Sequence, residues 1–201
     1  MTTEATPADA IVALVDHGEG IVSLVMQDTQ HRNVFRDALV DGILARLAEF
    51  ASGYPQAKVL ILRGLEDVFA AGADKQSLLD IANGQVHVKD LLISEKVLEV
   101  AVPTIAAMRG HAVGGGFVMG LCCDMVLASE SSRYGVNFME MGFTPGMGCT
   151  RLLEGLVGPY VANEMMFTAQ RVRGKQLRGL FNYILPHDEV EARAFKLAQQ
   201  I

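Results

Sequence analysis

The amino-acid sequence predicts a single domain with an α/β fold, and three observations support this prediction. Short apolar segments with strand character, such as 58–63, alternate with segments of helical periodicity, such as 33–50. The chain has 201 residues, of which 50% are hydrophobic, so it can bury one sizeable core. It contains no clear linker, so we expect a single domain over residues 11–201 after a flexible tail over residues 1–10. Propensity alone does not separate a doubly wound sheet from a spiral of repeated units.

The first half of the chain opens with a predicted hairpin. Ile11–Val15 and Ile21–Gln27 are apolar and β-branched, and His17–Gly20 is the turn between them. A helix follows, because apolar residues recur at helical spacing. These residues are Phe35, Leu39, Ile43, Leu47 and Phe50. A short buried strand, a small-residue loop and a helix start then follow at 58–63, 67–74 and 75–82.

The second half repeats the alternation of helices, strands and glycine-rich turns. The predicted helices are Asp90–Val100, Phe117–Cys123, Arg151–Gly158 and Tyr160–Ala169. The predicted strands are Thr104–Met108, Met125–Ala128 and Tyr134–Phe138. Glycine-rich turns lie at 111–116 and 142–148.

The composition excludes several classes of protein. The formal net charge is −6 and no long basic run is present, so nucleic acid is a poor partner and an anionic ligand needs a local basic patch. Cys122, Cys123 and Cys149 indicate buried packing and neither a disulfide framework nor a metal site. The first ten residues lack the pattern of a signal peptide, and no apolar run reaches transmembrane length. We therefore expect no metal, no membrane segment and a cytoplasmic location.

The sharpest local feature is the glycine-rich turn Gly114–Gly116, between a strand and an apolar helix. Glycine lets the backbone bend tightly and approach a ligand closely, and amides at a helix start carry partial positive charge. Neither the dinucleotide spacing GxGxxG nor the Walker pattern is present, so a structural turn is the alternative to an anion site. A second small-residue loop, 70–74, follows another strand. Two such loops can offer two backbone amides to one thioester oxygen.

Several sequence blocks, taken in order, carry a family resemblance. The segments FAAGAD (Phe69–Asp74) and GHAVGGG (Gly110–Gly116) resemble the two oxyanion-hole blocks of the crotonase, or enoyl-CoA hydratase, superfamily. The other matching blocks are QHRNVF (30–35), CDMVLASESSRYG (123–135), GFTPGMG (142–148) and GLFNYILPHDEV (179–190). The match in which these blocks occur extends over nearly the whole chain.

The resemblance implies a spiral of ββα units assembled as trimers or dimers of trimers, with C-terminal helices missing after Ile201. It implies a substrate carried on CoA or on the phosphopantetheine of an acyl carrier protein, and no other cofactor. By position, the amides of Ala73 and Gly115 form the oxyanion hole. Substrate contacts are implied for Gly72, Gly114 and Gly116. Arg32 would lie near the phosphates of the carrier, or else be a solvated loop charge.

Two positions separate this chain from the hydratases. Hydratases move protons with two glutamates, and the matching positions hold Val118 and Phe138, which cannot do so. The segments GGGFVMGLCCDMVLAS (114–129) and YGVNFMEMGFTPGMG (134–148) resemble those of a narrower group, the decarboxylases of polyketide β-branching cassettes. That resemblance implies decarboxylation of a 3-methylglutaconyl-type thioester to a 3-methylcrotonyl-type thioester through a dienolate held by the oxyanion hole. Val118 and Phe138 would line an apolar pocket that desolvates the substrate carboxylate.

The donor of the final proton is open. Some members of that group carry a tyrosine and a lysine at positions that correspond to Ser77 and Ile81 here. The candidates are Lys75, His87, Tyr134, a residue after Ile201 or a bound water. We assign His111, next to the glycine turn, a structural role.

Two rival functions remain. One is an enoyl-thioester hydratase, dehydratase or isomerase that uses Glu140 or Lys75 as its acid or base. Glu140 would share a face with Phe138 if that segment is a strand. The other rival is a non-catalytic subunit that binds acyl carrier protein.

Overall fold

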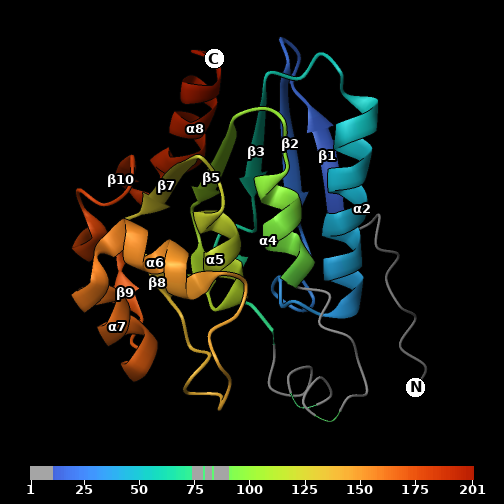
Figure 1. Cartoon of the computed structure of the whole chain (residues 1–201). Coiled ribbons are helices and arrows are strands. Elements are labelled where there is room, and N and C mark those ends of the chain that lie inside the picture. The colour runs from blue at the N-terminus through green and yellow to red at the C-terminus, as the bar shows by residue number, and fades with distance from the viewer. Residues whose placement is uncertain (1–10, 74–78, 80–82, 84–90) are drawn as a thin grey trace.

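The computed structural model describes residues 11–73, 79, 83 and 91–201. It confirms the α/β prediction, because helices pack around one large and one small β-sheet (Figure 1). The tail at 1–10 lies outside the described residues, so the division into a tail and one domain stays a prediction. None of the helices described is both long and apolar enough to cross a membrane.

The large sheet has six strands in the order β1-β2-β3-β5-β7-β10. Their bounds are β1 Val12–Asp16, β2 Ile21–Met26, β3 Val59–Arg63, β5 Thr104–Met108, β7 Met125–Ser129 and β10 Tyr183–Leu185. The predicted hairpin is confirmed, since β1 and β2 pair antiparallel, and every other pair in this sheet is parallel. The central strands are almost wholly buried, as expected for a parallel sheet covered on both faces.

Alternate residues of the central strands feed two separate cores. Leu60 and Leu62 face the larger core, which also holds apolar side chains of α2 (Asp37–Gly53), α4 (Leu91–Leu98) and α5 (Gly115–Leu121). Val59 and Ile61 face the other side of the sheet, where α8 (Val190–Ala198) covers β3, β5 and β7. Figure 1 shows α2 lying along β1 and β2, with α8 on the opposite side of the molecule.

The small sheet has four strands in the order β4-β6-β8-β9. They are β4 Val68–Ala70, β6 His111–Val113, β8 Arg133–Gly135 and β9 Val172–Arg173. The strands β4, β6 and β8 run parallel, so the loops that leave them emerge at one edge. Residues 71–73 follow β4 and residues 114–116 follow β6. Both lie within the two small-residue segments singled out in the sequence.

Three successive units repeat one plan. In β3–β4–α4, β5–β6–α5 and β7–β8–α6, the first strand joins the large sheet, the second joins the small sheet, and a helix follows. This repeat is the ββα spiral that the family resemblance implied. The chain continues through α6 (Cys149–Val157), α7 (Pro159–Thr168) and two short 3₁₀ turns, η1 (Gly174–Leu177) and η2 (His187–Glu189).

The predicted strand Tyr134–Phe138 is wrong in its second half. Strand β8 ends at Gly135, because its partner β6 ends at Val113, where the chain turns into α5. Residues 138–142 form a turn, in which the amide of Met141 donates to the carbonyl oxygen of Phe138 at 3.1 Å. Glu140 therefore does not share a strand face with Phe138.

Candidate active site

The two small-residue loops meet at Gly72 and Gly115. A Cβ atom placed on Gly72 would lie 3.0 Å from the amide nitrogen of Gly115 and 2.8 Å from the carbonyl oxygen of Val113. Gly72 also has a φ of +70°, a conformation that side chains rarely adopt. The sequence suggested two loops but could not show that they converge, and the parallel pairing of β4 with β6 brings them together.

Two backbone amides at this junction, those of Ala73 and Gly115, could serve a ligand. Gly115 opens α5, and the first amides of a helix have no partner within it. Ala73 directly follows Gly72 and is half-buried against the core. Within the described part of the chain, neither the amide of Ala73 nor that of Gly115 has a hydrogen-bond acceptor. The assignment of these two amides to an oxyanion hole stays a prediction, and this geometry supports it.

The neighbouring glycines are required for packing as well as for the turn. A Cβ atom on Gly116 would lie 2.4 Å from the carbonyl oxygen of Ala70, so the helix could not approach β4 as it does. Gly114 has a φ of +55°, and its amide donates to the carbonyl oxygen of Gly135 at 2.9 Å. Tight packing therefore fixes the position of the Gly115 amide, which explains the turn structurally and is compatible with the predicted functional role.

The described surroundings of the junction are mainly apolar. A Cβ atom on Gly115 would contact the sulfur of Met147 at 2.8 Å and the ring of Phe35 at 3.3 Å. Val118 lies one turn into α5 and is fully buried, and Phe138 is half-buried against the same core. The two positions that hold glutamate in hydratases thus add no titratable group here.

Two charged candidates lie at the surface in ion pairs. Arg32 pairs with Asp67 at 2.7 Å, and both side chains are more than half exposed. This pairing leaves Arg32 exposed near the start of β4, where the contact with carrier phosphates stays a prediction. Glu140 is 58% exposed and lies 3.6 Å from Arg171, so it projects to solvent from the 138–142 turn.

Tyr134 has contacts that favour a structural role over proton donation. Its side chain is fully buried, and its hydroxyl donates to the carbonyl oxygen of Met108 at 2.7 Å. The same hydroxyl accepts from the amide of Ser129 at 2.8 Å. Burial raises the pKa of Tyr134 far above its ordinary value, so the neutral form persists.

Two candidate proton donors lie outside the described residues. These are Lys75 and His87, together with the corresponding positions Ser77 and Ile81. His111 is described, and its Nδ1 accepts a hydrogen bond from the amide of Arg133 at 2.8 Å. That bond joins β6 to β8 and agrees with the structural role we expected for His111.

One cluster has the residue types of a metal site. Ligand atoms of Glu66, His187 and Asp188 lie within 4.8 Å of one another near the molecular surface. However, one guanidinium nitrogen of Arg109 lies 3.0 Å from a carboxylate oxygen of Glu66 and from one of Asp188. The arginine occupies the position that a cation would need, so this cluster is explained as an ion-pair network.

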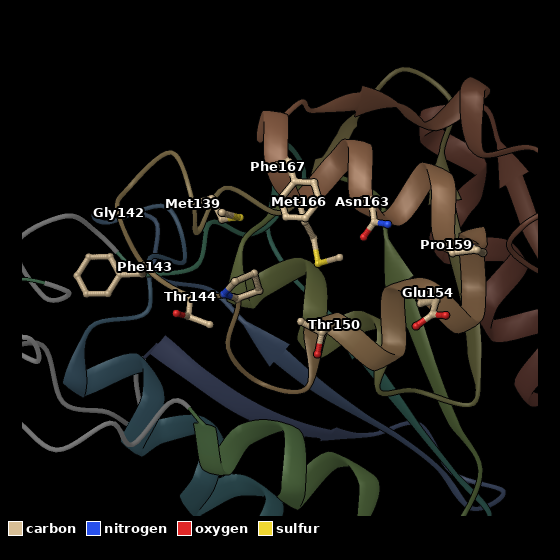
Figure 2. Close-up of a pocket in the computed structure, with 11 residues that line it drawn as sticks. Met139, Gly142, Phe143, Thr144, Thr150, Glu154, Pro159, Asn163, Met166 and Phe167 are labelled. Carbon is tan, nitrogen blue, oxygen red and sulfur yellow. The ribbon is translucent and has the colours of Figure 1, made fainter.

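Sequence reasoning missed a cavity in the second half of the chain. It has a volume of about 690 Å³ and lies between the 139–145 loop, α6 and α7 (Figure 2). Its lining residues are Met139, Gly142, Phe143, Thr144, Pro145, Thr150, Glu154, Pro159, Asn163, Met166 and Phe167. The only signal in the sequence was the apolar content of 159–168, and the structure leaves part of it, such as Phe167 at 67% exposure, uncovered.

Comparison with known proteins agrees with this fold. The family model described as enoyl-CoA hydratase/isomerase matches residues 16–201. The bacillaene synthase decarboxylase PksI of Bacillus subtilis is 38% identical over 194 residues, which cover 96% of this chain and 78% of that protein.

Two solved structures are similar over nearly the whole chain. The first, of a dehydratase/decarboxylase enzyme couple involved in polyketide β-branching, has a TM-score of 0.89 at 38% identity, covering 94% of this chain and 76% of that one. The second, the ECH2 decarboxylase domain of CurF from Lyngbya majuscula, has a TM-score of 0.87 at 37% identity, covering 96% and 79%. With its ββα spiral and a family match from residue 16 onward, the chain belongs to the enoyl-CoA hydratase/isomerase family and has the crotonase fold.

Proposed function

We propose that this protein decarboxylates a 3-methylglutaconyl-type thioester to a 3-methylcrotonyl-type thioester in polyketide β-branch formation. The observation that carries the proposal is the junction of Gly72 and Gly115, which has two available amides and apolar neighbours but no carboxylate at the two hydratase positions. The similarity to PksI and to the CurF domain, both named decarboxylases, supports the same reaction.

The chemistry suits these residues. The amides of Ala73 and Gly115 hold the thioester oxygen while the bond between the substrate's terminal carboxylate and its γ-carbon breaks. The electron pair of that bond moves through the double bond onto the thioester oxygen, giving carbon dioxide and a dienolate. Backbone donors stabilise the charge that develops on that oxygen. A proton then adds at the γ-carbon and completes the 3-methylcrotonyl product.

This reaction needs no cofactor, because the substrate's own thioester accepts the electron pair. The substrate is held on an acyl carrier protein or on CoA, and we propose a trimer or a dimer of trimers. Val118 and Phe138 contribute an apolar environment that weakens the hydration of the reacting carboxylate. Since the contacts of Tyr134 and Glu140 favour other roles, we assign the final proton to Lys75, His87, a later residue or a water.

Mass spectrometry of the thioester tests the proposal directly. The protein is incubated with 3-methylglutaconyl thioester on a carrier protein and, in parallel, on CoA. We expect the substrate to lose the mass of carbon dioxide, and the faster of the two substrates identifies the carrier. The control Ala73→Pro removes one amide hydrogen and should slow the loss.

A crotonyl thioester discriminates the rival functions. A hydratase or isomerase would convert this substrate into a hydrated or rearranged product, whereas the decarboxylase leaves it unchanged. Tight binding of acyl carrier protein with no turnover of either thioester would favour the non-catalytic subunit. Either of these results would contradict decarboxylation.

A further inference from the structure

Asn33 is a fully buried side chain that ties together two strand ends. Its Oδ1 accepts from the amide of Asp28 at 2.9 Å. Its Nδ2 donates to the carbonyl oxygen of Met26 at 3.1 Å, at the end of β2, and to that of Phe69 at 2.9 Å, in β4. The side chain thus satisfies backbone groups from both sheets at the entry to the first oxyanion-hole loop.

The backbone of residues 33–35 continues this connection towards Ala73. The carbonyl oxygen of Asn33 accepts from the amide of Ala71 at 3.1 Å, and the amide of Phe35 donates to the carbonyl oxygen of Gly72 at 2.8 Å. An isolated parallel bridge joins Val34 to Gly72. Every residue from Phe69 to Gly72 except Ala70 is therefore hydrogen-bonded or bridged to this segment.

The same segment also reaches the second loop. The ring carbons of Phe35 would lie 3.3 Å from a Cβ atom on Gly115, so the ring packs directly on that residue. Through Phe35, the segment contacts both loops that carry the proposed oxyanion amides. Its position therefore affects the separation of these two amides.

The backbone at this point is strained. Arg32 and Asn33 are consecutive non-glycine residues with φ values of +53° and +52°. Asparagine tolerates the left-handed region better than most residues, whereas arginine has no such advantage. Strain of this kind persists only where surrounding contacts impose it, and it concentrates at functional sites. The hydrogen bonds of Asn33 are the contacts that impose it here.

We propose that Asn33 is a positioning residue that sets the geometry of the oxyanion hole. It contacts neither the reacting atoms nor the thioester and acts through Phe69–Gly72 on the amide of Ala73. Hydrogen-bond donors stabilise an oxyanion only within a narrow range of distances, so a small shift of this loop removes much of their effect. This proposal depends on the proposed function in one respect: it takes the amides of Ala73 and Gly115 to be the donors of an oxyanion hole.

Two substitutions disrupt the side-chain contacts of Asn33, in part or in full, while leaving the backbone conformation accessible. Asn33→Asp has almost the same shape and keeps an acceptor for the amide of Asp28, but it places a carboxylate oxygen against the carbonyl oxygens of Met26 and Phe69. Asn33→Gly removes all of these contacts and accepts a positive φ without penalty. Asn182→Ala is the control for loss of an asparagine side chain outside the site: Asn182 is exposed, and its Oδ1 accepts from the amide of Val126 at 2.8 Å in β7.

Infrared spectroscopy of bound 3-methylcrotonyl thioester gives a readout that loss of stability alone does not change. A working oxyanion hole polarises the carbonyl and lowers its stretching frequency. We expect this shift in the wild type and in Asn182→Ala, and little of it in either Asn33 variant. For decarboxylation, we expect kcat to fall roughly 100-fold in the Asn33 variants with KM nearly unchanged, comparable to the loss of one oxyanion donor.

The outcomes separate this proposal from the proposed function. A folded Asn33 variant that keeps the full infrared shift would overturn the positioning role of Asn33. Failure of both variants to fold would also overturn it, since the role of Asn33 would then be stability. The infrared measurement uses the product and needs no turnover. A wild type that shows the shift but releases no carbon dioxide would therefore contradict decarboxylation alone.

Discussion

Gly72 touches Gly115 so closely that a Cβ atom on Gly72 would lie 3.0 Å from the Gly115 amide nitrogen. Gly72→Ala should therefore displace that amide and the neighbouring one of Ala73. We expect a loss in kcat of roughly 10²- to 10³-fold, the size of effect seen when one oxyanion donor is removed. Steady-state decarboxylation measurements check this result.

Gly179→Ala is the control for the strain of a positive φ. Gly179 has a φ of +84°, similar to that of Gly72, but a Cβ atom on it would meet nothing within 4 Å. Both variants carry comparable backbone strain, and only Gly72→Ala adds the clash. Equal activity in the two variants would contradict the assignment of Gly72 to the site.

Gly116→Ala should destabilise the fold, because its Cβ atom would lie 2.4 Å from the carbonyl oxygen of Ala70. Backbone cannot move aside as a flexible side chain can, so we expect a loss of about 1–3 kcal/mol in the free energy of unfolding. Gly155→Ala in α6 is the helical control, since nothing lies within 4 Å of its Cβ position. The free energy of unfolding of Gly155→Ala should rise by about 0.5–1 kcal/mol, which urea denaturation can resolve.

Much of the fold could be predicted from the sequence, since its signals are local. The hairpin at β1 and β2, the buried strand at β3 and the helix at α4 all lie where apolar periodicity indicated. The second half of the predicted strand Tyr134–Phe138 failed, because the length of β8 depends on its partner β6 and not on its own residues. Assignment of strands to two sheets likewise depends on long-range pairing, which periodicity does not contain.

The site could be predicted only in part. The residue types at Gly72 and Gly115 indicated tight loops, but their contact depends on the pairing of β4 with β6. No local pattern singled out Asn33, and Phe35 was assigned to the predicted helix although α2 begins at Asp37. Both residues lie in a block that carries the family resemblance. Their importance lies in hydrogen bonds and ring contacts to residues far along the chain, and such contacts leave no local pattern.

Glu140→Gln discriminates the decarboxylase from rivals that need this carboxylate. Glu140 is 58% exposed and 3.6 Å from Arg171, and an exposed ion pair contributes at most about 1 kcal/mol. We expect kcat/KM for decarboxylation to change by no more than about fivefold, the equivalent of that energy. Glu130→Gln, which removes an exposed acid paired with Arg178, is the control. Abolished turnover in Glu140→Gln alone would support a catalytic carboxylate.

Tyr134→Phe separates a structural hydroxyl from a catalytic one. Removing the hydroxyl leaves the carbonyl oxygen of Met108 and the amide of Ser129 without this buried partner. We expect a loss of about 1–3 kcal/mol in the free energy of unfolding, measured by denaturant titration. At temperatures where the variant is folded, decarboxylation should continue with an unchanged pH profile. Loss of turnover in the folded variant would restore Tyr134 as the proton donor.

The pH dependence of stability should include a contribution from His111. Burial lowers its pKa from the ordinary value of 6.5; Arg133, Arg32 and His187 lower it further, and Asp67 opposes them. The unfolded state therefore binds more protons than the folded state at pH values between the lowered pKa and 6.5. The contribution of His111 to the free energy of unfolding is fully present above pH 6.5. It is lost as the pH falls from 6.5 through the lowered pKa.

Besides this desolvation, the hydrogen bond from the amide of Arg133 to Nδ1 of His111 favours the neutral ring, because a protonated Nδ1 cannot accept it. His111→Gln should therefore flatten the fall in unfolding free energy below pH 6.5, measured by denaturant titration at several pH values. The pKa of His17 is also lowered by burial, so His17→Gln should remove a separate contribution of the same sign. If the curves of wild type and His111→Gln ran parallel across this window, the bond between β6 and β8 would not depend on the charge of His111.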